Sequence, residues 1–162
     1  MGCQAGRLMI YDPETKKTEY LNPPEFDNRT IRYITEDKRG RLWFGTQSGR
    51  LICFDGMNFS VVYELEKTAI IYKLLIDKKN GWVWLATHER GLYAIHPETG
   101  NEMAHYTSKK ENGGLFGNWI SDLEQLNDST LFATASGALH IINTHTKKVK
   151  VLTKEQGLPS NT

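Results

Sequence analysis

The strongest constraint on the fold is an internal repeat. "GCQAGRLMIYD" begins at Gly2 and "GTQSGRLICFD" begins at Gly45, and the two segments agree at most positions in register. A second pair, "GLFGNWI" at residue 114 and "GLPSNT" at residue 157, is also 43 residues apart. A repeat of this length indicates an array of similar structural units. The glycines that mark successive units, separated by 43, 42 and 46 residues, are Gly6, Gly49, Gly91 and Gly137.

Each unit is predicted to contain four short strands. The candidate segments are rich in β-branched and aromatic residues and are bounded by Gly, Pro, Asn and Asp, which is typical of strands and hairpins. The second strands, such as "LWF" and "VWL", are apolar almost throughout, which indicates burial on both faces. The first strands are expected at 31–37, 71–77 and 120–127, and the second strands at 41–46, 82–87 and 130–135.

Four strands in 42–46 residues is the size of one propeller blade. A single blade has two apolar faces, and stacking blades side by side buries both of them. The predicted fold is therefore all-β, with four-stranded antiparallel sheets in a partial β-propeller of about three and a half blades. We expect a chain that begins in the middle of a blade and is a piece of a larger propeller. The predicted units are 1–30 (the last two strands of an incomplete blade), 31–69, 70–118 and 119–156 (three blades) and 157–162 (a connector to a next blade).

The segment "ITEDKRGRLWFGTQSGRLICFD" at 34–55 resembles the two-component-regulator propeller repeat. The next unit keeps most of the pattern but has Ala86 for its second glycine. In the third unit Phe132 stands for the tryptophan, Ala133 for the glycine and residues 127–129 for the turn. The repeat positions that match are Asp37, Gly40, Trp43, Gly45, Thr46, Gly49, Asp77, Gly81, Trp84, Thr87, Gly91 and Gly137.

This resemblance implies a sensor. Proteins with this repeat are typically hybrid two-component histidine kinases of gut Bacteroides-type bacteria, anchored in the inner membrane. Their periplasmic propellers bind an oligosaccharide released from a glycan and signal by phosphorelay to a kinase and a transcriptional regulator. The resemblance thus implies a periplasmic location, with the kinase, membrane and regulator segments lying outside these 162 residues.

The recurring residues are interpreted as structural. Asp37 and Asp77 precede glycine-containing turns, and basic residues fill the places where a calcium loop would need oxygen ligands, so a turn is favoured over a metal site. Trp43 and Trp84 recur inside apolar strands, which favours packing between blades over a sugar-stacking platform. Threonines that recur near the ends of the second strands are expected to hydrogen-bond backbone, and they are Thr46, Thr87 and Thr134.

Ligand-binding residues are expected where the repeats differ, because the loops form the faces of a propeller. The hairpin "THERG" contributes His88, Glu89 and Arg90, and the long polar connector 108–119 ends in Trp119. The segment 22–29 adds an aromatic ring, Phe26, among amide and carboxylate groups. Aromatic faces beside planar hydrogen-bonding groups suit sugar recognition. The predicted ligand site is therefore His88, Glu89, Arg90 and Trp119.

Composition argues against several other classes. The 20 basic and 19 acidic residues are evenly spread, which speaks against nucleic acid or an anionic membrane as the partner. No segment approaches the roughly 20 apolar residues of a membrane-spanning helix, so no direct membrane insertion is expected. The two cysteines, at non-equivalent repeat positions, and the five histidines lack metal-site spacing. We expect no cofactor, no metal and no disulfide framework.

Two further functions stay open. A propeller-type lyase or glycosidase would take its carboxylates from separate loops, which a sequence alone does not reveal. A purely structural, protein-docking propeller would need no small ligand. The sequence carries no nucleophile elbow or phosphate loop. We therefore expect that this chain itself is not an enzyme and has no catalytic residues. The expected partners are an oligosaccharide, the remaining blades of the parent propeller and a second copy that covers exposed blade faces.

Overall fold

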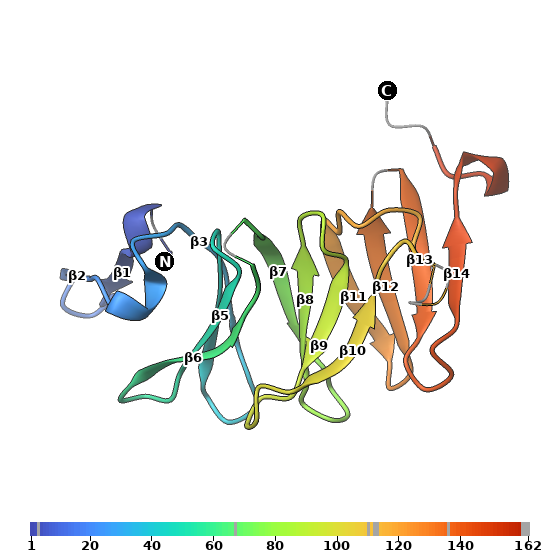
Figure 1. The fold of residues 1–162 in the computed structure, drawn as a ribbon. Coiled ribbons are helices and arrows are strands. Elements are labelled where there is room, and N and C mark those ends of the chain that lie inside the picture. Colours follow the sequence, from blue (N-terminus) through green and yellow to red (C-terminus); the bar gives the residue numbers. More distant parts are fainter. Residues whose placement is uncertain (3, 67, 110, 112–113, 136, 160–162) are drawn as a thin grey trace.

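The computed structural model describes residues 1–2, 4–66, 68–109, 111, 114–135 and 137–159. Its strands form one two-stranded and three four-stranded antiparallel sheets, which stand side by side in chain order (Figure 1). The predicted all-β architecture of propeller blades is confirmed. Within the described residues no helix is long and apolar enough to cross a membrane.

The sheets follow the order of the chain without crossovers. The first contains β1 (Leu8–Tyr11) and β2 (Thr18–Leu21), and the second contains β3 (Ile31–Glu36), β4 (Leu42–Thr46), β5 (Arg50–Phe54) and β6 (Phe59–Glu64). The third contains β7 (Ile71–Ile76), β8 (Val83–Thr87), β9 (Leu92–Ile95) and β10 (Glu102–Tyr106). The fourth contains β11 (Asp122–Asn127), β12 (Thr130–Ala135), β13 (Ala138–Asn143) and β14 (Val149–Leu152). The chain also forms short 3-10 helices, which are η1 (Gln4–Gly6), η2 (Pro24–Phe26) and η4 (Lys154–Gln156).

The core lies between the sheets rather than within any one of them. Trp43 of β4 is buried in the cluster that joins the second and third sheets, where it meets Val83 and Leu85. Trp84 of β8 is buried in the corresponding cluster between the third and fourth sheets, together with Ala133. The expectation that both tryptophans pack between blades is confirmed. The blade faces at these two boundaries are therefore apolar because a neighbouring blade covers each of them.

The duplicated glycines occupy one structural position. A Cβ atom on Gly2 would lie 2.7 Å from Cγ2 of Ile31, and one on Gly45 would lie 2.7 Å from Cγ2 of Ile71. Both isoleucines begin the first strand of the following sheet, which we call its inner strand. The next blade thus approaches the backbone too closely for a side chain at this position, which explains why the motif repeats glycine there.

The fourth sheet corrects the sequence alignment of the third predicted blade. Leu123 of β11 pairs with Ala133, in the way that Leu74 of β7 pairs with Leu85. Ala133 therefore occupies the position of a large core residue, and not that of the repeat glycine as predicted. Thr134 is exposed, whereas Thr46 and Thr87 are fully buried, so its predicted equivalence to them is also wrong. The equivalent of those buried threonines is Ala135, which is 1% exposed and pairs with Ala138 at the end of β12.

Candidate functional site

Loops gather at two opposite ends of the sheets. Because neighbouring strands are antiparallel, the hairpins after the second strands and the connectors between sheets share one end, which we call the connector end. It includes the β4–β5 and β8–β9 hairpins and the connectors 65–70 and 107–121. The opposite end, called the turn end, holds the β3–β4, β7–β8 and β9–β10 turns.

Three aromatic side chains meet at the connector end. Tyr72 comes from β7, His88 from the β8–β9 hairpin and Trp119 from the connector before β11. The centroid of the Trp119 ring lies 4.9 Å from that of His88, in edge-on geometry, and 6.2 Å from that of Tyr72, in stacked geometry. The Tyr72 and His88 rings are 6.0 Å apart. Trp119 keeps 47% of its surface exposed, so this aromatic cluster presents an accessible ring to solvent.

Backbone hydrogen bonds hold Trp119 against the hairpin. Ile120 N–H donates to the Thr87 carbonyl at 3.0 Å, and Gly91 N–H donates to the Asn118 carbonyl at 2.8 Å. The side-chain oxygen of Asn118 also accepts from Ser108 N–H at 2.7 Å, which closes the connector on itself. The residues on both sides of Trp119 are thus fixed to the β8–β9 hairpin. This explains how residues far apart in the chain form one cluster.

The two charged residues of the predicted site have different surroundings. Glu89 has a left-handed backbone (φ 61) and a side chain that is 74% exposed, with its carboxylate 4.0 Å from Nε2 of His88. Arg90 forms an ion pair with Glu66 of the preceding connector. Its carbonyl also accepts a hydrogen bond from Nε2 of His105 at 2.8 Å. Glu89 therefore lies beside the aromatic cluster, whereas Arg90 is engaged with the neighbouring connector.

The sequence prediction missed Tyr72. This residue lies in an inner strand whose other residues are apolar except for Lys73, and an aromatic side chain in such a strand is expected to be core. The equivalent inner-strand residues are Arg32 and Ser121, so the position varies from unit to unit. Variation at one repeat position was the criterion that selected His88, and the same criterion applied to inner strands would have selected Tyr72.

The segment 22–29 does not offer an aromatic face to a ligand. Phe26 is fully buried, and its ring packs edge-on against Phe44 at 5.3 Å and Phe59 at 5.6 Å. The predicted role of Phe26 in sugar binding is therefore wrong, because the preceding connector uses this ring to fill the space between sheets. In the predicted connector 108–119, residues 110, 112 and 113 lie outside the described part of the chain.

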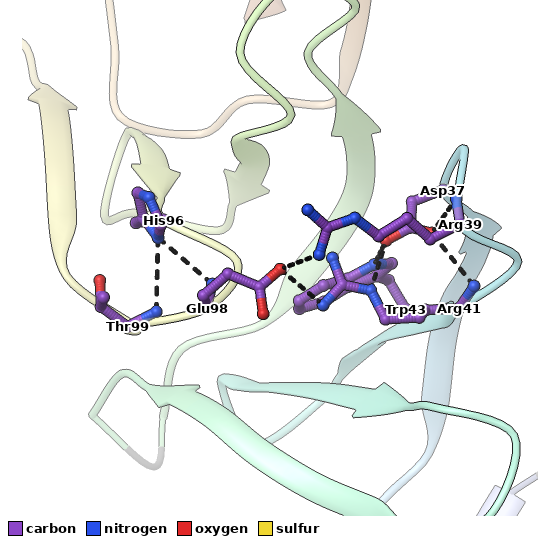
Figure 2. A network of polar contacts seen from close by, with 7 residues as sticks. All are labelled: Asp37, Arg39, Arg41, Trp43, His96, Glu98 and Thr99. Carbon is purple, nitrogen blue, oxygen red and sulfur yellow. Dashed lines mark hydrogen bonds and ion pairs between the residues drawn. The ribbon is translucent and has the colours of Figure 1, made fainter.

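The turn end carries a polar network (Figure 2). The Asp37 carboxylate accepts hydrogen bonds from the Trp43 indole at 3.0 Å and from Nε of Arg41 at 2.8 Å. Burial raises the pKa of the Asp37 carboxyl, but the hydrogen bonds from Trp43, Arg41 and two backbone N–H groups outweigh it, so the pKa is lowered overall. Arg39 and Arg41 both donate to Oε1 of Glu98, at 2.8 and 2.9 Å. The Asp37 oxygens thus accept hydrogen bonds from the turn and from the core tryptophan.

This network joins two sheets. Glu98 belongs to the β9–β10 turn, where Nδ1 of His96 accepts from the backbone N–H groups of Glu98 and Thr99. A pocket of about 320 Å³ opens beside it, and there Nζ of Lys38 donates to the Lys78 carbonyl at 2.8 Å. The polar groups of the turn end are therefore paired across the blade boundary. Within the described residues no group of metal-ligating side chains is gathered at either end.

Comparison with known proteins places the chain among β-propellers. The β-propeller domain of Cps50 (Swd1) from Myceliophteria thermophila superposes with a TM-score of 0.71 at 19% identity, over 94% of this chain and 50% of that one. No curated protein sequence matches the chain. A likeness at this level of identity establishes the fold, and the class is a β-propeller.

The repeat itself is of a more particular kind. Residues 25–48 match the family model described as two component regulator propeller, which confirms the resemblance seen in the sequence. The extracellular domain of BT3049, described as a hybrid two component system of B. thetaiotaomicron, superposes with a TM-score of 0.68 at 24% identity over 80% of this chain. The extracellular domain of BT4673, described as a one component system of the same organism, gives 0.62 at 22% identity over 93%. This chain spans 19% of the length of each of those domains.

Proposed function

We propose that the chain is part of an extracytoplasmic ligand-sensing propeller of a hybrid two-component system. The matched repeat and the extracellular propellers that it resembles support this assignment. In this proposal the chain binds a glycan-derived oligosaccharide and performs no catalysis, and a kinase and a transcriptional regulator lie on other segments of the parent protein. The location would be periplasmic, with the parent anchored in the inner membrane.

The observation that carries the proposal is the aromatic cluster. Trp119 offers a half-exposed ring to the apolar face of a sugar, and aromatic rings of this kind combine a large contact area with a polar edge. His88 and the exposed Glu89 carboxylate lie beside it and supply hydrogen bonds to hydroxyl groups. All three residues come from loops, which is where a rigid β scaffold carries its binding residues.

A binding experiment tests this assignment. The protein is titrated with a panel of oligosaccharides by calorimetry, and Trp119→Ala is compared with Phe116→Ala. Phe116 is a matched control because it is an exposed aromatic residue (58%) of the same connector without a ring contact to the cluster. We expect Trp119→Ala to weaken binding about tenfold or more and Phe116→Ala to leave it within about twofold. Equal affinities for both variants would overturn the proposed site.

The same panel separates the other functions. Products detected by mass spectrometry after incubation would replace the sensor proposal with a lyase or glycosidase. Binding to protein partners without binding to any oligosaccharide would favour a docking propeller.

Association with further blades or a second copy is also proposed. Ile10, Tyr11 and Tyr20 of the first sheet expose between 49% and 65% of their surface. Beside them an apolar cavity of about 150 Å³ is lined by Leu8, Phe44 and neighbouring side chains. Exposed apolar surface of this kind is covered in stacked blades. Light scattering tests the proposal, and a clean monomer at high concentration would contradict association between copies.

A further inference from the structure

A buried histidine stands among the core residues of the fourth sheet. In the β12–β13 register His140 pairs with Ala133, as Tyr93 pairs with Leu85 in the third sheet. In the second sheet the same position is occupied by Ile52. His140 is fully buried. A buried imidazole needs hydrogen-bond partners to offset its desolvation, so its contacts define its role.

Both nitrogens of His140 are bonded. Phe116 N–H donates to Nε2 at 2.8 Å, and Nδ1 lies 3.1 Å from the Ala133 carbonyl. A backbone N–H only donates, so Nε2 carries no proton. Nδ1 must then be the protonated nitrogen, and it donates to the Ala133 carbonyl. This neutral tautomer is the form that satisfies both neighbours.

The hydrogen bond to Nε2 ties the connector to the fourth sheet. Phe116 follows Leu115, which is 3% exposed and lies in the core cluster between the third and fourth sheets. Ala133 is small where the third sheet has Leu85, and a small residue at this position leaves room for the imidazole and for Leu115. Three residues after Phe116 the connector reaches Trp119. Phe116, the residue that His140 bonds, is thus close in the chain to Trp119, whose ring is proposed to bind sugar.

We propose that His140 is a positioning residue for the aromatic cluster, and that protonation of its Nε2 releases the connector and weakens ligand binding. The ligand-binding part of this inference rests on the proposed function. An imidazolium has a proton on Nε2, and two N–H groups that face each other repel. The Phe116 N–H would then lose its acceptor, and the segment that leads to Trp119 would lose one of the contacts that hold it.

The surroundings of His140 favour the neutral form. Burial lowers its pKa below the usual 6.5, although the hydrogen bond to the Ala133 carbonyl opposes this. Tyr106 of β10 is the titratable side chain of the adjoining core, and burial raises its pKa, so it stays neutral. His105 alternates with Tyr106 onto the other face of β10, where it stacks on Tyr93. Among the described residues, the charged side chains of the elements packed against His140 are exposed, and they are Glu102, Lys109, Glu111, Asp122, Glu124 and Lys150.

The direction of the pH effect follows from this shift. A histidine whose pKa is lower in the folded state stabilises the fold at pH above its unfolded value. That contribution is lost as the pH falls below about 6.5, when the unfolded or released form takes up the proton first. Release of the connector is therefore expected under mildly acidic conditions.

The wild-type protein gives the first test without a ligand. Nuclear magnetic resonance of the imidazole nitrogens is recorded from about pH 7.5 to about pH 5, together with the Phe116 amide signal. We expect the Nδ1–H tautomer at the higher pH, and loss of the hydrogen-bonded Phe116 amide in step with protonation of His140. A Phe116 amide that stays unchanged through that protonation would overturn the inference.

Two variants give the second test. His140→Gln keeps a carbonyl oxygen that can accept from Phe116 but does not titrate in this range, and His140→Leu removes the acceptor. The indole N–H resonance of Trp119 is followed in a His88→Gln background, because the His88 ring touches the Trp119 ring. We expect His140→Gln to lose the acid transition, and His140→Leu to show the acid signal already at neutral pH. An unchanged transition in His140→Gln would contradict the role of His140.

Ligand affinity gives the third test and separates the two proposals. With His88 restored, we expect His140→Leu to lower oligosaccharide affinity about tenfold, the effect of one partly buried amide that has lost its acceptor. If no oligosaccharide binds, the proposed function fails while the ligand-free tests still decide the role of His140. If oligosaccharides bind equally well to His140→Leu and wild type, the positioning role fails while the proposed function stands.

Discussion

The third sheet buries a carboxylate–indole pair on one face, and the fourth sheet buries a histidine on the other. In the third sheet the Asp77 carboxylate accepts from the Trp84 indole at 3.1 Å, on the face that meets the fourth sheet. At the corresponding places β11 and β12 have Leu126, which is 60% exposed, and the half-buried Phe132. Instead the fourth sheet buries His140 on the face toward the third sheet. The comparison shows that a blade can lose its carboxylate–indole pair and still use buried polar side chains, His140 among them, to fix a neighbouring segment.

The two arrangements fix different things. Asp77 also accepts from the backbone N–H groups of Lys79 and Asn80, so it holds its own turn together as well as the tryptophan. His140 bonds a connector that belongs to the boundary between blades. The first arrangement is local to one blade and recurs with the repeat, as at Asp37 and Trp43. The second depends on how two blades meet, as does the buried Gln125 of β11, whose side-chain oxygen accepts from Lys78 N–H of the third sheet at 2.8 Å.

The largest difference in stability between the two sheets is expected at the equivalent aromatic positions, Trp84 and Phe132. We expect Trp84→Ala to destabilise the protein by about 3–5 kcal/mol, because it removes a fully buried ring and leaves the Asp77 carboxylate without its indole partner. Phe132→Ala is the matched change and should cost about 1 kcal/mol, because the ring is only half-buried. Urea unfolding followed by circular dichroism measures both. Similar losses would show that the two rings contribute equally to their blades.

The hairpin glycines give a second matched pair. Gly91 and Gly137 share φ 82, but a Cβ atom on Gly91 would lie 2.1 Å from the Tyr106 carbonyl, whereas one on Gly137 meets nothing within 4 Å. Gly137→Ala should therefore cost about 1 kcal/mol for the left-handed backbone alone. Gly91→Ala should cost about 3 kcal/mol or more, because the clash adds to the strain. Thermal unfolding of the two variants checks this, and equal melting temperatures would contradict the packing at Gly91.

The turn carboxylate gives a smaller effect. Asp77 is 3% exposed, so Asp77→Ala leaves two backbone N–H groups and an indole without their acceptor, and we expect a loss of about 1–3 kcal/mol. Leu126→Ala changes the equivalent position of the fourth sheet and should cost less than about 0.5 kcal/mol. The free energy of unfolding in urea measures both changes. A neutral Asp77→Ala would show that solvent replaces the lost hydrogen bonds.

The smallest expected effect is the pH dependence of Asp37. Its pKa is lowered below the usual 3.8 in the folded protein, so its contribution to stability is present above that pH and is lost as the pH falls through the folded value. The difference in unfolding free energy between wild type and Asp37→Asn, on the order of 1 kcal/mol after solvent screening, should shrink between about pH 6 and about pH 3. A constant difference across this range would mean that the charge of Asp37 contributes nothing.

Much of the fold is predictable from the sequence because the repeat is regular. Glycine at residues 2 and 45 and tryptophan at 43 and 84 each mark one position of a blade, and the structure confirms all four positions. The third unit was aligned wrongly at Ala133 and Thr134, since an "AT" pair can be matched to "GT" one residue out of register. Only strand pairing resolves such a shift, because a slip of one residue moves every side chain to the other face.

The candidate site was predictable in part. His88 and Trp119 were selected because their loops depart from the repeat, and the structure brings their rings together. Tyr72 was missed because an aromatic residue in an inner strand looks like core, and Phe26 was misplaced because an aromatic residue in a loop looks exposed. In both cases the local sequence does not determine which neighbouring sheet or loop the aromatic ring will contact.

The sequence by itself determined the class of fold, the number of strands in each unit and the residues that recur, because these depend on short-range pattern and period. The tertiary structure alone decided which departures from the repeat meet one another. Tyr72, His88 and Trp119 are up to 47 positions apart, and His140 reaches Phe116 across 24. Such contacts arise from the stacking of one blade on the next, and each requires a backbone geometry that no single repeat contains.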